Sequence, residues 1–127
     1  MIGAISRAES FARKALEATY NGKALITERQ KARNPHTKIV EESEVPVLVD
    51  EPCHLSYTNV SAVEQAGAAA KTAQVTKLFL SPDVRIKPGS KVMVAQNGIT
   101  RIYESSGVAA VYPTHQEIVL KLAEEYA

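Results

Sequence analysis

Residues 74–127 alternate short apolar runs with turn-forming pairs of residues, which is typical of antiparallel strands. An Asn-Gly pair is a strong hairpin signal, because both central residues of a type I′ turn need positive φ. Residues 91–96 are therefore expected to pair with residues 99–104. The turn-forming pairs are Pro82-Asp83, Pro88-Gly89, Asn97-Gly98 and Ser106-Gly107.

Residues 7–20 show apolar positions at helical spacing, so the pattern predicts a helix over this range. Ser6 followed by Glu9 is a capping-box pattern, and Gly22 is expected to supply the stop at the other end. The apolar stripe of this helix is narrow and rich in alanine. We expect it to pack closely, either on the chain's own sheet or on a neighbouring subunit.

Residues 23–57 are predicted to form the first strands. An extended run over 23–33 leads to a turn at Asn34-Pro35-His36-Thr37, because proline presets φ and asparagine tolerates left-handed geometry. A short return strand follows at 38–40. The acidic residues 41–44 are interpreted as a link to a second extended run over 45–57, in which Pro46 and Pro52 suit edges or bulges.

Residues 58–72 interrupt the strand pattern with an alanine-rich stretch that offers little bulky apolar surface. We interpret it as a flexible insertion, open to two explanations: a functional loop or a tolerated surface loop. Residues 74–127 then form the barrel strands. The whole chain, 1–127, is predicted to be a single, mainly β domain: a small antiparallel β-barrel or sandwich with an N-terminal α-helix and a long flexible loop.

Composition narrows the function classes. The 127 residues are 45% hydrophobic, and no apolar run approaches the ~18 residues that a membrane helix needs. The first residues lack the pattern of a signal peptide, so we expect the chain to stay in the compartment where it is made. Cys53 is the single cysteine, which excludes an internal disulfide and a multi-cysteine zinc site.

Charge is distributed unevenly along the chain. Residues 1–40 hold eight Lys and Arg against three Glu, whereas residues 41–127 hold seven against eleven Asp and Glu. A strongly basic nucleic-acid binder has a different composition. Two interpretations stay open: an ordinary solvated surface, or one positive and one negative face suited to stacking against charged neighbours.

Candidates for catalysis are few. His115 and Glu117 share a strand face and could hold a metal or act as base and orienting group, but a structural pair is the alternative. Cys53 and His54 are adjacent, so a strand points them to opposite faces, and Cys53 is expected to be a small buried side chain. His36 is expected to be exposed. No cofactor or metal site is predicted.

Four segments in a fixed order resemble the small neck proteins of long-tailed bacteriophages and PBSX-like prophages, the head-closure or head–tail connector proteins. The likeness extends over roughly residues 45–127, and none of its motifs is catalytic. The segments are PCHLSY at 52–57, KLFLSPDVRIKPGSKV at 77–92, GVAAVY at 107–112 and HQEI at 115–118.

The resemblance implies a small β-barrel and a structural role in virion assembly, not an enzyme. Copies of such proteins form an oligomeric ring between the portal or adaptor and the tail, which helps to retain packaged DNA and offers a docking surface for the tail. The implied partners are other neck proteins and further copies of the chain, with non-specific contact to packaged DNA left open and no membrane. The implied location is the bacterial host cytoplasm during assembly, then the neck of a virion or prophage-derived particle.

The expected interaction surfaces are the insertion and the N-terminal helix. We expect the isolated chain to be monomeric or weakly associated, with residues 58–72 poorly ordered. Two other functions stay open: a β-barrel adaptor unrelated to phage that binds a protein through an edge strand, and a small metal-dependent enzyme. The candidate interaction residues are Glu64, Gln65, Ala66, Gly67, Ala68, Ala69, Ala70, Lys71, Arg7, Arg13 and Lys14.

Overall fold

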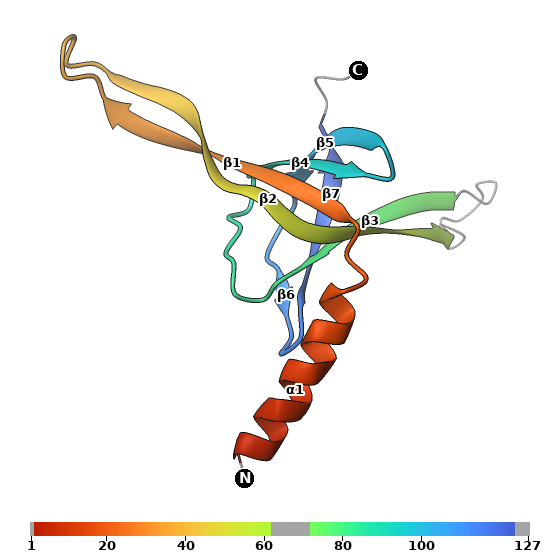
Figure 1. Ribbon diagram of the computed structural model, residues 1–127. Helices are drawn as coiled ribbons and strands as arrows, with labels where there is room; N and C mark the ends of the chain where they lie inside the picture. Colours follow the sequence, from red (N-terminus) through yellow and green to blue (C-terminus); the bar gives the residue numbers. More distant parts are fainter. Residues whose placement is uncertain (1, 62–71, 124–127) are drawn as a thin grey trace.

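The computed structural model describes residues 2–61 and 72–123 (Figure 1). It confirms a mainly β antiparallel fold with one N-terminal helix. The elements are α1 (Ile2–Glu17), β1 (Gly22–Arg33), β2 (Val40–Ser61), β3 (Thr72–Leu80), β4 (Lys91–Gln96), β5 (Ile99–Ser105), β6 (Ala110–Val111) and β7 (Gln116–Leu122).

The strands form one sheet that closes on itself. Their order is β3-β2-β1-β4-β5-β7-β6, and β3 also pairs with β7. Leu78 lies at this closing seam, with Leu55 of β2 opposite it on one side and Ile118 of β7 on the other. We call the result the closed sheet. Its closure satisfies backbone groups that would otherwise form two long free edges.

Strand β2 pairs with two different strands along its length. Its first part pairs with β1 as far as Gly22↔Cys53, and its second part pairs with β3 from Cys53↔Leu80 onward. The β1–β2 register shifts between Ala24 and Thr27, and Asp50 on β2 has a positive φ of 54°. Such irregularities bend a strand and increase its twist, which suits a strand that leaves one partner for another.

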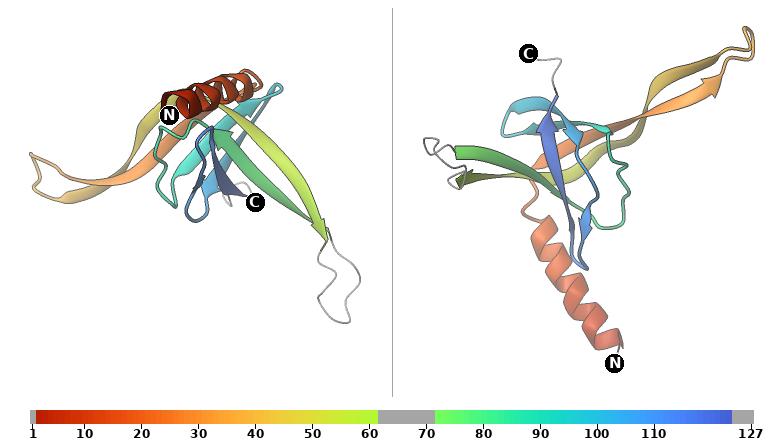
Figure 2. Two further views of the ribbon diagram at one scale, coloured as in Figure 1. Left: turned by 90° about the horizontal axis from the view of Figure 1, so that it is seen from below. Right: turned by 180° about the vertical axis from the view of Figure 1, so that it is seen from behind.

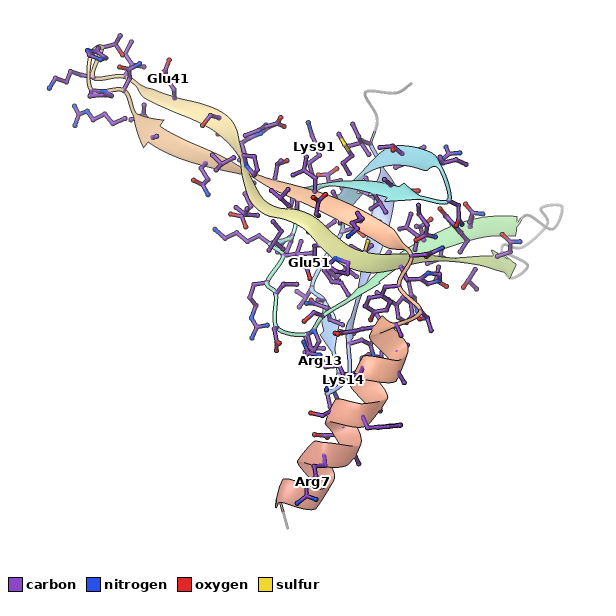
Figure 3. The ribbon with its side chains drawn as sticks, in the orientation of Figure 1. Arg7, Arg13, Lys14, Glu41, Glu51 and Lys91 are labelled. Carbon is purple, nitrogen blue, oxygen red and sulfur yellow. The ribbon has the colours of Figure 1, made fainter. Side chains whose placement is uncertain are left out.

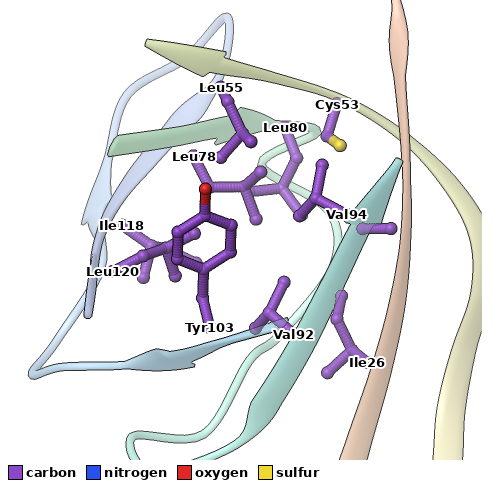
Figure 4. Close-up of a cluster of buried hydrophobic side chains, with 11 residues drawn as sticks. Ile26, Cys53, Leu55, Leu78, Leu80, Val92, Val94, Tyr103, Ile118 and Leu120 are labelled. Atoms are coloured by element: carbon purple, nitrogen blue, oxygen red, sulfur yellow. The ribbon is translucent and has the colours of Figure 1, made fainter. Parts of the chain in front are cut away.

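The core fills the inside of the closed sheet with alternate residues of its strands (Figure 4). Inward-facing positions recur every second residue, as the pleat of a strand requires. Tyr103 adds the one aromatic ring of this cluster. The cluster contains Ala24, Ile26, Cys53, Leu55, Leu78, Leu80, Val92, Val94, Tyr103, Ile118 and Leu120.

Leu55 lies beyond the first residue of β1, Gly22, so no strand of the described chain pairs with it on that side, and the side chain of Gln96 forms the backbone hydrogen bonds instead. Its Oε1 accepts a hydrogen bond from the Leu55 N–H at 2.8 Å, and its Nε2 donates to the Leu55 carbonyl at 3.3 Å. A Cβ atom on Gly22 would lie 2.8 Å from that Oε1. Position 22 therefore needs glycine because of this close approach.

Residues 81–90 form no strand, although they lie within the predicted barrel region. Gln116, which is buried, holds their first turn: its Nε2 donates to the carbonyls of Ser81 and Val84, each at 2.7 Å. The predicted hairpin is confirmed, since Asn97 and Gly98 both have positive φ between β4 and β5.

Several predictions in the N-terminal half are wrong in their bounds. The helix runs over Ile2–Glu17 and not 7–20, so Ser6 lies inside it and is not its cap. Gly22 begins β1 and is not the helix stop. Residues 41–44 are not a link, because β2 is continuous through them. The ends of the predicted insertion, 58–61 and 72, belong to β2 and β3.

Candidate interaction surfaces

One arginine ties α1 to the closed sheet. The Arg13 guanidinium donates to Ser81 Oγ and to Asp83 Oδ2, both at 2.7 Å, and to Glu17 Oε2 at 3.0 Å. The hydrogen bond from Arg13 lowers the pKa of Asp83, and the bonds from Arg13 to Asp83 and Glu17 raise the pKa of Arg13. Leu16 and Glu17 are half-buried on this side of the helix.

The opposite side of α1 is uncovered. Arg7, Phe11 and Lys14 are four and three residues apart, so they lie on one helix face. All three are exposed, and Phe11 is 78% exposed. Figure 3 shows Arg7 and Lys14 on the helix as it leaves the sheet. We call these three residues the outer helix face, an aromatic ring between two cations.

The contact between Arg13 and Asp83 predicts an acid-sensitive helix. A lowered pKa means that the contact stabilises the docked helix above the ordinary pKa of aspartate and is lost as the pH falls through the lowered value. Asp83→Asn at pH 7 should therefore speed amide hydrogen exchange in the last turn of α1 several-fold, and acid should do the same to the unmodified chain.

The matched control for that measurement is Asp50→Asn, which removes an exposed carboxylate elsewhere and keeps a residue that tolerates positive φ. This control should leave exchange in α1 unchanged. An NMR titration gives a second readout, because Arg13→Ala should return the Asp83 pKa to its ordinary value. An Asp83 pKa that stays low without Arg13 would contradict the assignment.

The far ends of β1 and β2 form a hairpin with no core beneath it. We call residues 28–33 and 40–45 the distal arm. It projects beyond the closed sheet, and Figure 3 labels Glu41 near its tip. Oppositely charged residues face each other across it: Arg29 is opposite Glu44, and Lys31 is opposite Glu42. In the arm, therefore, the basic and acidic parts of the sequence meet in pairs instead of forming separate faces.

The base of the arm is held by Lys91 of β4. Its Nζ lies 2.8 Å from Glu44 Oε2, and this contact lowers the pKa of Glu44. Pro46 and Pro52 lie on β2 where it has no second neighbour within the described chain. Proline cannot donate a backbone hydrogen bond, so this edge is poorly suited to strand addition.

A hollow of about 640 Å³ opens at one end of the closed sheet. Residues of β2, β3, β4, β5 and β7 line it, most of them at inward-facing positions, whereas Lys121 lies at an outward-facing position between Leu120 and Leu122. Three large side chains at its rim stay half-exposed although they occupy inward positions: Tyr57 at 49%, Ile99 at 54% and Leu122 at 52%. The core therefore does not fill this end of the closed sheet.

The charged side chains that line the hollow within the described chain are positive. Among the described residues that line it, Arg101 and Lys121 are the charged ones, and both are cations. Burial, and after it the hydrogen bond with Tyr57, raises the pKa of Tyr103 to about 12. Tyr103 is therefore neutral at physiological pH. The hollow offers apolar surface, three hydroxyl side chains (Tyr57, Thr76 and Tyr103) and two positive charges.

Both ring faces and both ring nitrogens of His115 contact neighbouring side chains. Its ring stacks between those of Phe79 and Tyr112, with centroid distances of 5.2 Å and 4.9 Å. Its Nε2 lies 2.9 Å from Glu117 Oε2, and its Nδ1 lies 3.0 Å from Thr114 Oγ1. Within residues 2–61 and 72–123, no group of three His, Cys, Asp or Glu gathers as a metal site.

The other sequence candidates are placed clearly. Cys53 is fully buried, as predicted, and burial raises its thiol pKa to about 12. His36 is exposed, as predicted. His54 Nδ1 lies 3.0 Å from Asn21 Oδ1. No helix of the described chain is long and apolar enough to cross a membrane.

Of the predicted interaction residues, Arg7 and Lys14 lie on the outer helix face, while Arg13 is engaged with the sheet. Residues 64–71 lie outside the described residues. Sequence reasoning missed the hollow and the distal arm. The signal for the hollow was weak: large apolar residues at alternate positions look alike whether the closed sheet covers them or leaves them at its mouth.

The fold and these surfaces define a small, mainly β domain with two projecting elements. Comparison with known protein families gave no match, and no curated protein matched the chain. Among solved structures, the chain is similar to the phage-like element PBSX protein xkdH from Bacillus subtilis, with a TM-score of 0.46 and 13% sequence identity. The likeness covers 85% of this chain and 96% of that one.

Proposed function

We propose that this chain is a structural subunit of a bacteriophage or prophage neck, which joins copies of itself into a ring between the portal side and the tail. One observation carries the proposal: α1 and the distal arm leave the closed sheet in different directions with most of their surface uncovered (Figure 2). The ring would help to retain packaged DNA and would offer the tail a docking surface.

Both projecting elements gain from a neighbour. An isolated helix of this length is marginal in water, and so is an isolated two-stranded hairpin. Phe11 on the helix and Val40 on the arm are 78% and 62% exposed. Packing these elements against another subunit would bury that surface and order them further. A contact between unlike surfaces of identical copies closes into a ring when its rotation allows.

The motif segments supply the phage part of the proposal. Residues 52–57 lie in β2, residues 77–92 run from β3 into β4, and residues 115–118 lead into β7. The strand residues among them belong to the closed sheet, and residues 81–90 form the connection between β3 and β4. In this proposal the closed sheet is the rigid wall of each subunit, and the contacts between copies of the chain are made by what projects from it. Assembly takes place in the cytoplasm of the bacterial host.

Deleting the gene from the phage or prophage that encodes it tests the function. We expect DNA-filled heads that lack tails and lose their DNA, because the neck is incomplete. Electron microscopy and measurement of DNA retained per particle give the readout, with the unmodified gene supplied in trans as the control. Intact tailed particles from the deletion strain would contradict the proposal.

A second candidate function is a protein-binding adaptor unrelated to phage, and the half-exposed rim of the hollow is the observation that favours it. The two functions differ in their genetic setting. Portal and capsid genes on one side and tail genes on the other support the neck, whereas a setting without virion genes supports the adaptor.

A further inference from the structure

The hollow at the mouth of the closed sheet is built like an incomplete core. Tyr57, Ile99 and Leu122 come from three different strands and line the same space while about half of each side chain is exposed. Large apolar side chains at inward positions are normally covered. The volume of about 640 Å³ lies within the range of binding pockets, which combine apolar side chains with a few polar groups.

Backbone groups are also free beside this space. Strand β7 pairs with β3 up to Thr76↔Leu120 and with β5 up to Tyr103↔Leu122, after which the Ala123 N–H donates to the Ile102 carbonyl. Beyond these pairs, no strand of the described chain lies between residues 72–75 of β3 and residues 99–101 of β5. An extended segment could therefore add to either strand there.

The charges of the lining select the occupant. Arg101 and Lys121 are cations, and no carboxylate of the described chain lines the hollow. Arg101 is at an inward-facing position, whereas Lys121 lies at the edge, on the outer face and opposite Glu104 of β5. A cationic segment would be repelled, whereas a carboxylate next to an apolar side chain would meet both the charge and the apolar rim. The outer helix face of a second copy does not fit, because Phe11 is flanked by Arg7 and Lys14.

We propose that the hollow is a docking site for an extended segment of a partner protein that carries apolar side chains beside carboxylates. The apolar side chains enter between Tyr57, Ile99 and Leu122, and the carboxylates meet Arg101 and Lys121. The inference deepens the proposed function. It rests on that function in one respect only, the identification of the partner as another structural protein of the neck. The chemistry of the site stands on its own geometry.

The test is an NMR titration of the whole chain with a synthetic ten-residue peptide in which leucine alternates with glutamate. We expect shift changes at residues 72–76 and 99–103 and at Tyr57 and Leu122. The matched peptide, with lysine in place of glutamate, should bind at least about tenfold more weakly, a difference of about 1.4 kcal/mol. Equal affinity of the two peptides, no binding, or shifts confined to the distal arm would overturn the proposal.

Variants locate the site. Arg101→Glu with Lys121→Glu should weaken binding of the leucine–glutamate peptide by about tenfold or more, whereas Lys31→Glu with Arg33→Glu on the arm should not. Ile99→Asp should abolish binding, and Val108→Asp, at a residue that is 90% exposed elsewhere, should leave it unchanged. The spectrum of each free variant shows whether it is folded. Binding that survives Ile99→Asp in a folded variant would count against the hollow.

A chain that ends at Ala123 separates a partner from the chain's own last residues, 124–127, which include two glutamates and a tyrosine. Equal peptide affinity with and without these residues supports a partner segment. Much tighter binding to the shortened chain would show that they compete for the site, and would overturn the assignment to a partner. Peptide binding together with intact tailed particles in the deletion strain would refute the neck function alone.

Discussion

Leu78→Ala is expected to lower the free energy of unfolding by about 2–5 kcal/mol. Leu78 is fully buried on β3 and sits opposite Leu55 on one side and Ile118 on the other, so its side chain packs at the seam that closes the sheet. Truncation leaves a cavity where three strands meet, and these cannot collapse without breaking their register. Urea unfolding followed by circular dichroism measures the loss.

Val119→Ala is the matched control for Leu78→Ala. Val119 lies on β7 next to Ile118, but it points outward and is 42% exposed. Its truncation should cost less than about 1 kcal/mol, since it removes little buried area. A loss for Leu78→Ala no larger than that of the control would mean that the seam does not hold the closed sheet together.

Gly22→Ala is expected to cost about 1–3 kcal/mol, although it adds a single methyl group. The new Cβ would lie 2.8 Å from Gln96 Oε1 and 3.1 Å from the Cys53 carbonyl oxygen. Gln96 must then move, and the Leu55 N–H and carbonyl that it satisfies are left buried without partners. Thermal and urea unfolding give the size of the effect.

A double-mutant cycle identifies that mechanism. Gln96→Ala removes the same two hydrogen bonds directly, so the double variant Gly22→Ala with Gln96→Ala should be little less stable than Gln96→Ala alone. Additive losses from the two substitutions would mean that Gly22 is required for another reason, such as its contact with the backbone at Cys53.

Local sequence signals identified the features that depend on a few neighbouring residues. Asn97 and Gly98 determine their turn through the φ values that each can adopt, and the hairpin of β4 and β5 follows from that turn. The turn at residues 34–37 was also predictable, since the Asn34 side chain accepts hydrogen bonds from the N–H groups of His36 and Thr37. Burial of Cys53 followed from its residue type.

Long-range features could not be predicted in the same way. The pairing of β3 with β7 joins segments far apart in the sequence, and nothing local to Leu78 or Ile118 specifies it. The hollow depends on that closure, because Tyr57 of β2 and Ile99 of β5 share one space only after the sheet has curved round. Their half-exposure follows from where β7 ends, which alternation alone does not reveal.

The acidic residues 41–44 were misread because the arm has no buried face. A strand is recognised by an apolar stripe, and here residues 41–44 place charged and polar side chains on both faces of the strand. Arg29 opposite Glu44 and Lys31 opposite Glu42 are the reason for the charge pattern. Ser6 and Glu9 misled for a different reason: the two residues of a capping pattern can also occur inside a helix, and here α1 begins before them.

The two strands of the distal arm are paired along their backbones, but their side chains are not part of the core cluster. The arm can therefore tolerate more substitutions than the closed sheet. Under the proposed neck function, substitutions at positions such as Lys31 or Glu42 would alter what the arm binds at little cost to folding, whereas changes at Leu78 or Gly22 are constrained by stability. In β1 and in β2, one part of the strand thus belongs to the arm and the other part to the stable closed sheet. Such a chain can follow a changing partner by drift in the arm while selection preserves the closed sheet.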